Sequence, residues 1–229
     1  AMSVLQVSRR PSALRSGARR SGARSGWRLA VGLVLLSAVP LAAGALRLLE
    51  LAGGPELRPP DPRFGVVPVA LVVHIVGAAV FALVGILQFL PRFRRAHRRW
   101  HRRAGRALMM TGLAVAGSAL WLTLFYEPQR GTGRLLYAFR LVCATAMLAG
   151  LALGFAAIRR GDVRSHRAWV IRAYAIGLGA GTQAFTEGFA EALFGDGVLV
   201  GDLAKGAAWV INLAVAEWAI RRRGEPRAW

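Results

Sequence analysis

The sequence predicts an all-α polytopic membrane protein with six transmembrane helices, and three observations lead to this fold class. Six segments are mostly apolar, the connections between them are short, and basic residues gather in alternate connections. A helix rises about 1.5 Å per residue, so most of these segments are long enough to cross a hydrocarbon core of about 30 Å. The segments are residues 29–46, 64–90, 107–126, 135–158, 168–194 and 206–220.

The basic residues define the expected orientation of these helices. If the helices alternate in direction, one side holds both tails and the 91–106 and 159–167 connections, and it carries 23 of the 31 Lys and Arg residues. The opposite connections carry six, and only Arg140 and Arg172 lie inside spans. Cytoplasmic connections carry the excess of positive charge in membrane proteins. We therefore expect a bacterial inner-membrane protein with both termini in the cytoplasm.

The regions outside the spans are mostly small and polar. The N-terminal tail repeats Ser-Gly-Ala-Arg between residues 16 and 25, and such a segment is expected to be disordered. A Gly- and Pro-rich turn at 53–63 separates the first two spans, and Pro91 ends the second. The expected organisation is a disordered tail at 1–26, a transmembrane domain at 27–221 with its core at 64–194, and a second tail at 222–229.

Charge and cysteine content exclude several classes of function. A net charge of +20 would suit nucleic-acid binding in a soluble protein. Here the arginines flank apolar segments, so we expect anionic lipid headgroups as partners and no nucleic acid. The single cysteine, Cys143, lies within a span, which excludes a disulfide framework and a thiolate metal site. No protein partner and no reaction follow from the composition.

Two short motifs give the chain a family resemblance. Residues 101–106 read His-Arg-Arg-Ala-Gly-Arg, and residues 162–175 fit Asp-x-x-x-His-Arg-x-Trp-x-x-Arg-x-Tyr-Ala. With His74 in the second span and Gln-Phe at its end, this order resembles a family of bacterial predicted membrane proteins, domain of unknown function 2306. The resemblance covers about residues 66–192. It implies a four-helix core from spans two to five with spans one and six as additions, and it implies no activity.

The chain departs from the pattern of that family at one place. Members often carry an arginine about ten residues after the Tyr-Ala pair, where this chain has Gln183 and Ala184, followed by two glutamates. This difference puts any ligand shared with the family in that region in doubt.

Polar residues in the outer halves of the spans form one candidate site. An unpaired charge in the membrane costs at least about 2.5 kcal/mol, so these groups are expected to meet one another. One interpretation is an outward-opening pocket. The other is an ion pair between Arg140 and Glu187 that fixes helix register, with His74 hydrogen-bonded to a neighbouring helix. The candidates are His74, Arg140, Gln183, Glu187 and Glu191.

A second candidate site lies at the cytoplasmic ends of spans three and five. A haem b needs two imidazoles from different helices, which His101 and His166 could supply. Alternatively, the histidines and neighbouring arginines bind an anion such as a lipid phosphate, because each His-Arg pair opens a helix whose N-terminus favours negative charge. Beyond the haem iron of the first alternative, we expect no metal. The candidates are His101, Arg102, Arg106, His166, Arg167 and Arg172.

These observations favour a small membrane protein with a polar intramembrane site, linked to redox chemistry through haem or quinone. A second hypothesis is a non-redox carrier for a small solute, based on the outer polar residues and the glycine-rich helices. A third is an accessory membrane subunit without chemistry of its own. A discontinuous helix would favour the carrier.

Overall fold

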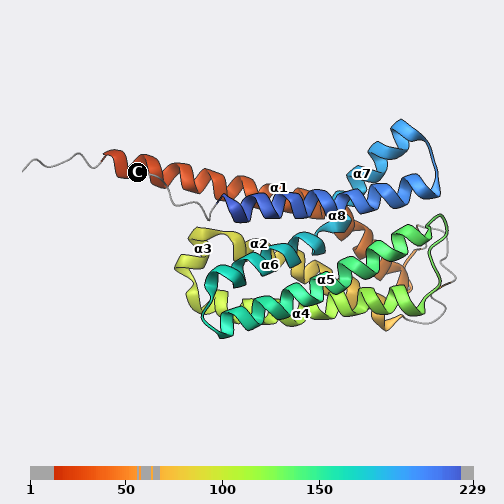
Figure 1. Ribbon diagram of the computed structural model, residues 1–229, viewed down its shortest axis with the longest axis horizontal. Coiled ribbons are helices and arrows are strands. Elements are labelled where there is room, and N and C mark those ends of the chain that lie inside the picture. Colours follow the sequence, from red (N-terminus) through yellow and green to blue (C-terminus); the bar gives the residue numbers. More distant parts are fainter. Residues whose placement is uncertain (1–12, 56, 58–62, 64–67, 223–229) are drawn as a thin grey trace, which may run out of the picture.

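The computed structural model describes residues 13–55, 57, 63 and 68–222, and the side chains from residue 26 onward. All regular structure in these residues is helical. Figure 1 shows long helices that run roughly along one axis. The helices are α1 (Ala13–Leu51), α2 (Val69–Phe89), α3 (Pro91–Ala96), α4 (Arg98–Phe125), α5 (Arg134–Arg159), α6 (Val163–Gly177), α7 (Gly179–Phe194) and α8 (Val198–Arg221).

Five of these helices are long and apolar enough to cross a membrane. They are α1 from Gly26 onward, α2, α4, α5 and α8. The expected fifth span, 168–194, is not one continuous helix. It falls within α6 and α7, which have 15 and 16 residues and are divided at Leu178. At about 1.5 Å per residue, neither half alone reaches across a hydrocarbon core of about 30 Å.

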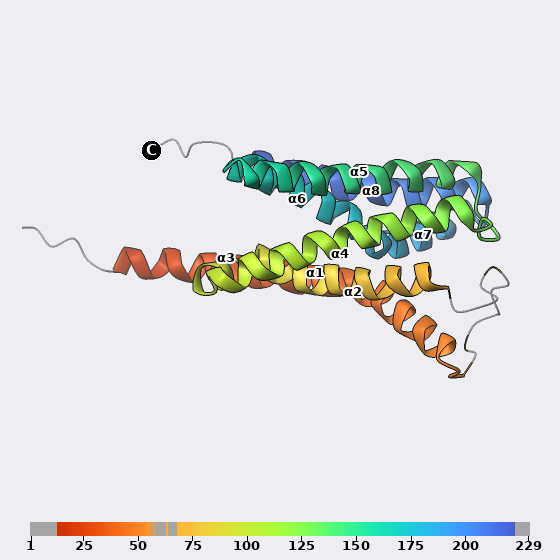
Figure 2. The ribbon, with the colours of Figure 1, turned by 90° about the horizontal axis from the view of Figure 1, so that it is seen from below.

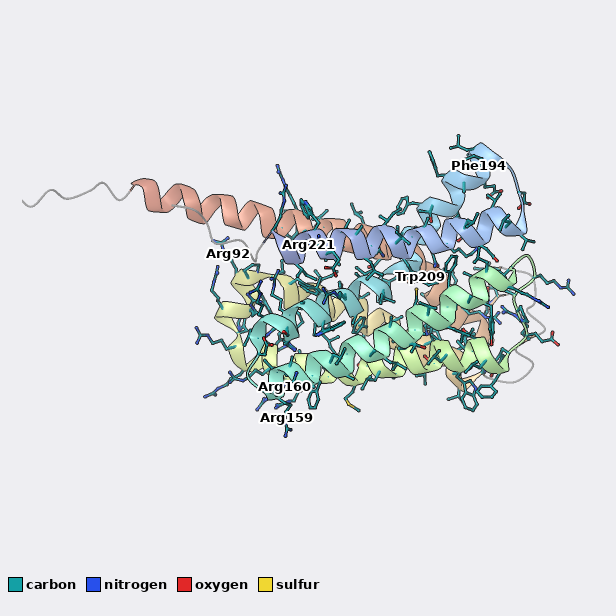
Figure 3. All side chains as sticks on the ribbon, in the orientation of Figure 1. Arg92, Arg159, Arg160, Phe194, Trp209 and Arg221 are labelled. Carbon is teal, nitrogen blue, oxygen red and sulfur yellow. The ribbon has the colours of Figure 1, made fainter. Side chains whose placement is uncertain are left out.

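Side chains of α8 bind the backbone where α6 ends. In a continuous helix, the carbonyls of Ala175 and Ile176 would accept hydrogen bonds from the amides four residues later. Here Asn212 Nδ2 donates to the Ala175 carbonyl at 3.0 Å, and Trp209 Nε1 donates to the Ile176 carbonyl at 3.3 Å. Figure 3 shows Trp209 between α8 and the break. Both freed carbonyls are therefore satisfied inside the protein, as the membrane interior requires.

Glycines allow three other helices to approach this break. An added Cβ at Gly179 would collide with the Trp209 indole of α8, and one at Gly181 would collide with the backbone carbonyl of Leu36 in α1. A Cβ at Gly177 would press against the Phe81 ring of α2. The Gly-Leu-Gly-Ala-Gly sequence therefore ends α6 at a point where α1, α2 and α8 pack closely.

The packing does not set α8 apart as an addition to a four-helix core. Helices α2, α4, α5 and α6 pack in succession, and the buried residues Phe81, Leu151 and Tyr174 lie among them. Helix α8 packs against α5, α6 and α7 and buries Asp202 and Ala208 completely or nearly so. A separate four-helix core is therefore not confirmed, because Trp209 and Leu213 of α8 also pack against the buried cluster.

Helix α1 begins earlier than the sequence predicted and contains a proline. It begins at Ala13, within the stretch where the sequence predicted a disordered tail, and residues 1–12 lie outside the described residues. Alanine and arginine are good helix formers, which fits a continuation of the helix into this region. Pro40 lies inside the helix, and the part that follows diverges from α2 in Figure 2. Proline removes a backbone donor and bends a helix in this way.

The two ends of the bundle differ in charge. Figure 3 shows Arg92, Arg159, Arg160 and Arg221 at one end, and the start of α1, α3 and the α5–α6 turn lie there too in Figure 1. We call this the arginine-rich end. The end of α1, the start of α2 and the connections α4–α5 and α7–α8 lie at the opposite end.

Candidate functional site

At the arginine-rich end, the first turn of α6 positions His166. Asp162 is the N-cap residue and its carboxylate accepts a hydrogen bond from the Ser165 backbone N–H at 2.9 Å. Hydrogen bonds from Ser165 also lower the pKa of Asp162. His166 Nδ1 lies 2.8 Å from the Gly154 carbonyl of α5. A carbonyl only accepts, so Nδ1 carries the proton, and a neutral ring then keeps its lone pair on Nε2.

His101 and Gln88 present buried polar atoms without partners. Among the described residues, His101 Nδ1 and both polar atoms of the Gln88 amide are buried and make no hydrogen bond. The antiparallel packing of Phe81 on Gly112 places Gln88 level with the first turns of α4, where His101 lies. His101 and His166 are close enough to interact electrostatically. We call Gln88, His101 and His166 the histidine–glutamine group.

The arginines predicted to surround these histidines point in two other directions. Arg102 and Arg106 lie on the outward face of α4, where with Arg99 and Arg103 they line a hollow. On α6, Arg167 Nη2 donates to the Ala219 carbonyl of α8 at 3.5 Å.

Arg172 of α6 is also turned toward α8. It forms a two-pronged ion pair with Glu217, with Nη2 3.1 Å from Oε2, and its guanidinium carbon lies 4.8 Å from the Trp169 ring centroid. Glu217 balances the charge of Arg172 there, and the membership of Arg172 in an anion site stays a prediction. Arg172 is close to His166 in the sequence, but the sequence could not show that α8 packs against the side of α6 that carries Arg172.

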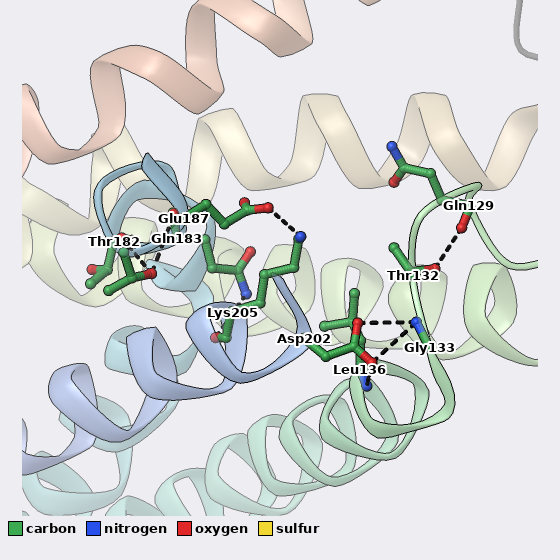
Figure 4. A network of polar contacts seen from close by, with 10 residues as sticks. Gln129, Thr132, Gly133, Leu136, Thr182, Gln183, Glu187, Asp202 and Lys205 are labelled. Carbon is green, nitrogen blue, oxygen red and sulfur yellow. Dashed lines mark hydrogen bonds and ion pairs between the residues drawn. The ribbon is translucent and has the colours of Figure 1, made fainter. Parts of the chain in front are cut away.

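At the opposite end, Glu187 of α7 pairs with Lys205 of α8, as Figure 4 shows. Gln183 Nε2 donates to the Lys205 backbone carbonyl at 3.4 Å. Among the described residues, no ion pair joins Arg140 and Glu187, although the sequence suggested one. The reason is that α7 packs mainly against α8 and α1, whereas Arg140 lies on α5. Arg140 still lies within electrostatic range of Glu187.

Asp202 of α8 binds the first turn of α5. Its carboxylate accepts hydrogen bonds from the Gly133 backbone N–H at 3.0 and 3.1 Å and from the Leu136 backbone N–H at 3.0 Å (Figure 4). The first N–H groups of a helix have no intrahelical partner, so Asp202 acts as an N-cap supplied by another helix. Sequence analysis placed Asp202 in a connection and missed this role.

His74 makes its contacts within the bundle. Its Nδ1 lies 3.2 Å from both the Val115 carbonyl and the Ser118 hydroxyl of α4. This agrees with the interpretation in which His74 hydrogen-bonds a neighbouring helix. It also lies within electrostatic range of Arg140. Glu191, the remaining member of the predicted outer cluster, is exposed near the end of α7.

The structure therefore brings part of each predicted site together. Sequence analysis missed Lys205, Asp202 and the unpartnered side chain of Gln88 as members of a site. A signal existed for two of them, because Lys205 is the single lysine and Gln88 shares a helical face with His74. Among the described residues, no three His, Cys, Asp or Glu side chains are grouped to hold a metal ion.

These helices and their intramembrane polar contacts define an α-helical membrane protein with several candidate spans. The chain belongs to the family described as predicted membrane protein, DUF2306, whose family model matches residues 71–220. The match extends past the 66–192 region that carried the resemblance and includes nearly all of α8. No curated protein and no solved structure matches the chain.

Proposed function

We propose that this protein is a membrane-embedded redox protein that holds a haem b between His101 of α4 and His166 of α6. The observation that carries the proposal lies in the histidine–glutamine group, where His101 Nδ1 and the Gln88 amide are buried and have no partner among the described residues. An unsatisfied buried donor or acceptor costs about 1–3 kcal/mol, so three such atoms in Gln88 and His101 point to a ligand there.

The chemistry of the group fits a haem with two histidine ligands. Such a haem takes one neutral imidazole from each of two helices. His166 Nδ1 donates to the Gly154 carbonyl. A hydrogen bond from Nδ1 to a backbone carbonyl commonly orients a histidine that binds a metal through Nε2. Arg94 lies within electrostatic range of His101 and could pair with a haem propionate. A bound haem would supply one-electron transfer, while these residues hold and orient it.

Absorption spectra of the purified protein test this proposal. Protein expressed with sufficient haem is expected to show a Soret band that shifts on reduction, and His101→Ala and His166→Ala should each lose it. His97→Ala is the matched control, because His97 is exposed at the same end, one turn before His101. Wild-type protein without a Soret band, or unchanged spectra in both ligand variants, would overturn the proposal.

We also infer that α6 and α7 together make a sixth crossing and that the arginine-rich end faces the cytoplasm of an inner membrane. The supports are the positive-inside bias and the common end at which α1 starts and α8 finishes. Alkaline phosphatase fused after residue 229, or within 92–106, is expected to be inactive. Activity from either fusion contradicts this topology.

The discontinuous helix favours one alternative, a carrier for a small polar solute. Carriers often bind their substrate where a helix is broken near the middle of the membrane. Thr182 and Gln183 lie in the first two turns of α7, and the Thr182 hydroxyl donates to Asn212 Oδ1 at 2.7 Å. These polar groups beside the break are the observation that supports the alternative.

Cysteine accessibility separates the carrier from a static bundle. In a Cys143→Ala background, Thr182→Cys of a carrier should react with a membrane-impermeant thiol reagent from both sides of the membrane. Val210→Cys is the control, because Val210 is exposed on an apolar helix and should face lipid. Labelling of Thr182→Cys from one side, or from neither, counts against alternating access.

A further inference from the structure

The first three turns of α4 carry an arginine-lined hollow that the proposed haem site does not use. Arg99, Arg102, Arg103 and Arg106 are all exposed and line the hollow. Their spacing of three and four residues places them on one helix face. His101 lies well away from this face around the helix axis, because each residue turns the helix by about 100°. The two features are therefore separate.

The hollow concentrates positive charge that the protein itself does not balance. Among the described residues, none of these four arginines forms an ion pair with an acidic side chain. Like charges at such spacing repel one another on a helix. They also lie at the N-terminal end of α4, where the helix dipole already favours negative charge over positive. An anion in the hollow would relieve both effects.

The position of the hollow along α4 indicates where that anion comes from. Helix α4 has 28 residues and is therefore about 42 Å long, which exceeds a hydrocarbon core of about 30 Å. Its first turns thus project to the depth of the lipid headgroups. Trp100 lies beside the hollow in sequence and packs edge-on against Phe93 with centroids 4.8 Å apart, an aromatic pair of the kind found at membrane interfaces.

We propose that this hollow binds the phosphate of an anionic phospholipid in the adjacent leaflet. Guanidinium groups donate paired hydrogen bonds to phosphate oxygens, and four of them on one face can hold a single headgroup from several directions. A lipid reaches this depth by lateral diffusion in the membrane, whereas a soluble phosphate has to compete from the water.

Native mass spectrometry of the full-length protein with phosphatidylglycerol and phosphatidylcholine tests the proposal. Wild-type protein should retain phosphatidylglycerol preferentially, and the Arg102→Gln, Arg106→Gln double variant should lose most of this preference, at least about fivefold if two of four bidentate contacts are removed. The matched control is the Arg159→Gln, Arg160→Gln double variant, which removes the same charge from exposed positions at the same end.

The following outcomes would contradict the binding of an anionic phospholipid in the hollow. Equal loss of lipid in both double variants would show that only overall charge matters, and unchanged retention in the Arg102→Gln, Arg106→Gln variant would show that the hollow is not the site. Inorganic phosphate that displaces phosphatidylglycerol at equal concentration would assign the hollow to a soluble anion instead. If the double variant fails to fold, Arg103→Gln alone is compared with Arg160→Gln in the same measurement.

Discussion

Asp202 gives the most direct test of how the end of the bundle opposite the arginines is held together. Its side chain is 2% exposed and accepts hydrogen bonds from the backbone N–H groups of Gly133 and Leu136. Asp202→Ala leaves both donors without acceptors. Each unsatisfied buried donor costs about 1–3 kcal/mol, so we expect the free energy of unfolding to fall by about 4 kcal/mol. Asp202→Asn keeps one acceptor oxygen and should cost about 1–2 kcal/mol.

Thermal unfolding in detergent measures the difference. For a chain of this size, 1 kcal/mol shifts the melting midpoint by about 2–4 °C, so we expect a fall of about 8–16 °C for Asp202→Ala and about 2–8 °C for Asp202→Asn. Cys143, half-buried in α5, reports unfolding through a thiol-reactive fluorophore. Asp196→Ala, an exposed acid between α7 and α8, is the control. If Asp202→Ala melts within about 2 °C of that control, the capping role is refuted.

Two further predictions concern helix packing. A Cβ at Gly85 would overlap the Tyr174 ring, so Gly85→Ala should lower the melting midpoint. A Cβ at Gly117 meets open space, so Gly117→Ala should leave the midpoint unchanged or raise it. Equal effects of the two changes would contradict the close contact between Gly85 and Tyr174. Glu187→Gln alone should destabilise the protein more than the double change with Lys205→Met, with a coupling of about 1 kcal/mol, because the single change leaves a charged lysine without its partner. Additive effects in the double-mutant cycle would show that the pair contributes nothing.

The sequence alone predicted the features that depend on composition along the chain. Long apolar segments gave five of the six predicted spans as single helices. Both ends of α2 and α5 agree closely with the prediction, whereas α1, α4 and α8 begin well before the predicted spans. The two His-Arg motifs gave the family.

The tertiary structure decided which polar groups meet. Periodicity gives the direction of a side chain around its own helix but not the identity of the neighbouring helix. For this reason the sequence paired Glu187 with Arg140, whereas α8 brings Lys205 to it. The break at Leu178 depends on the same helix, because Trp209 and Asn212 bind the carbonyls that the break exposes. A local sequence of glycine and leucine within an apolar segment permits a continuous helix as well as a broken one. The hydrogen bonds from α8 stabilise the broken form.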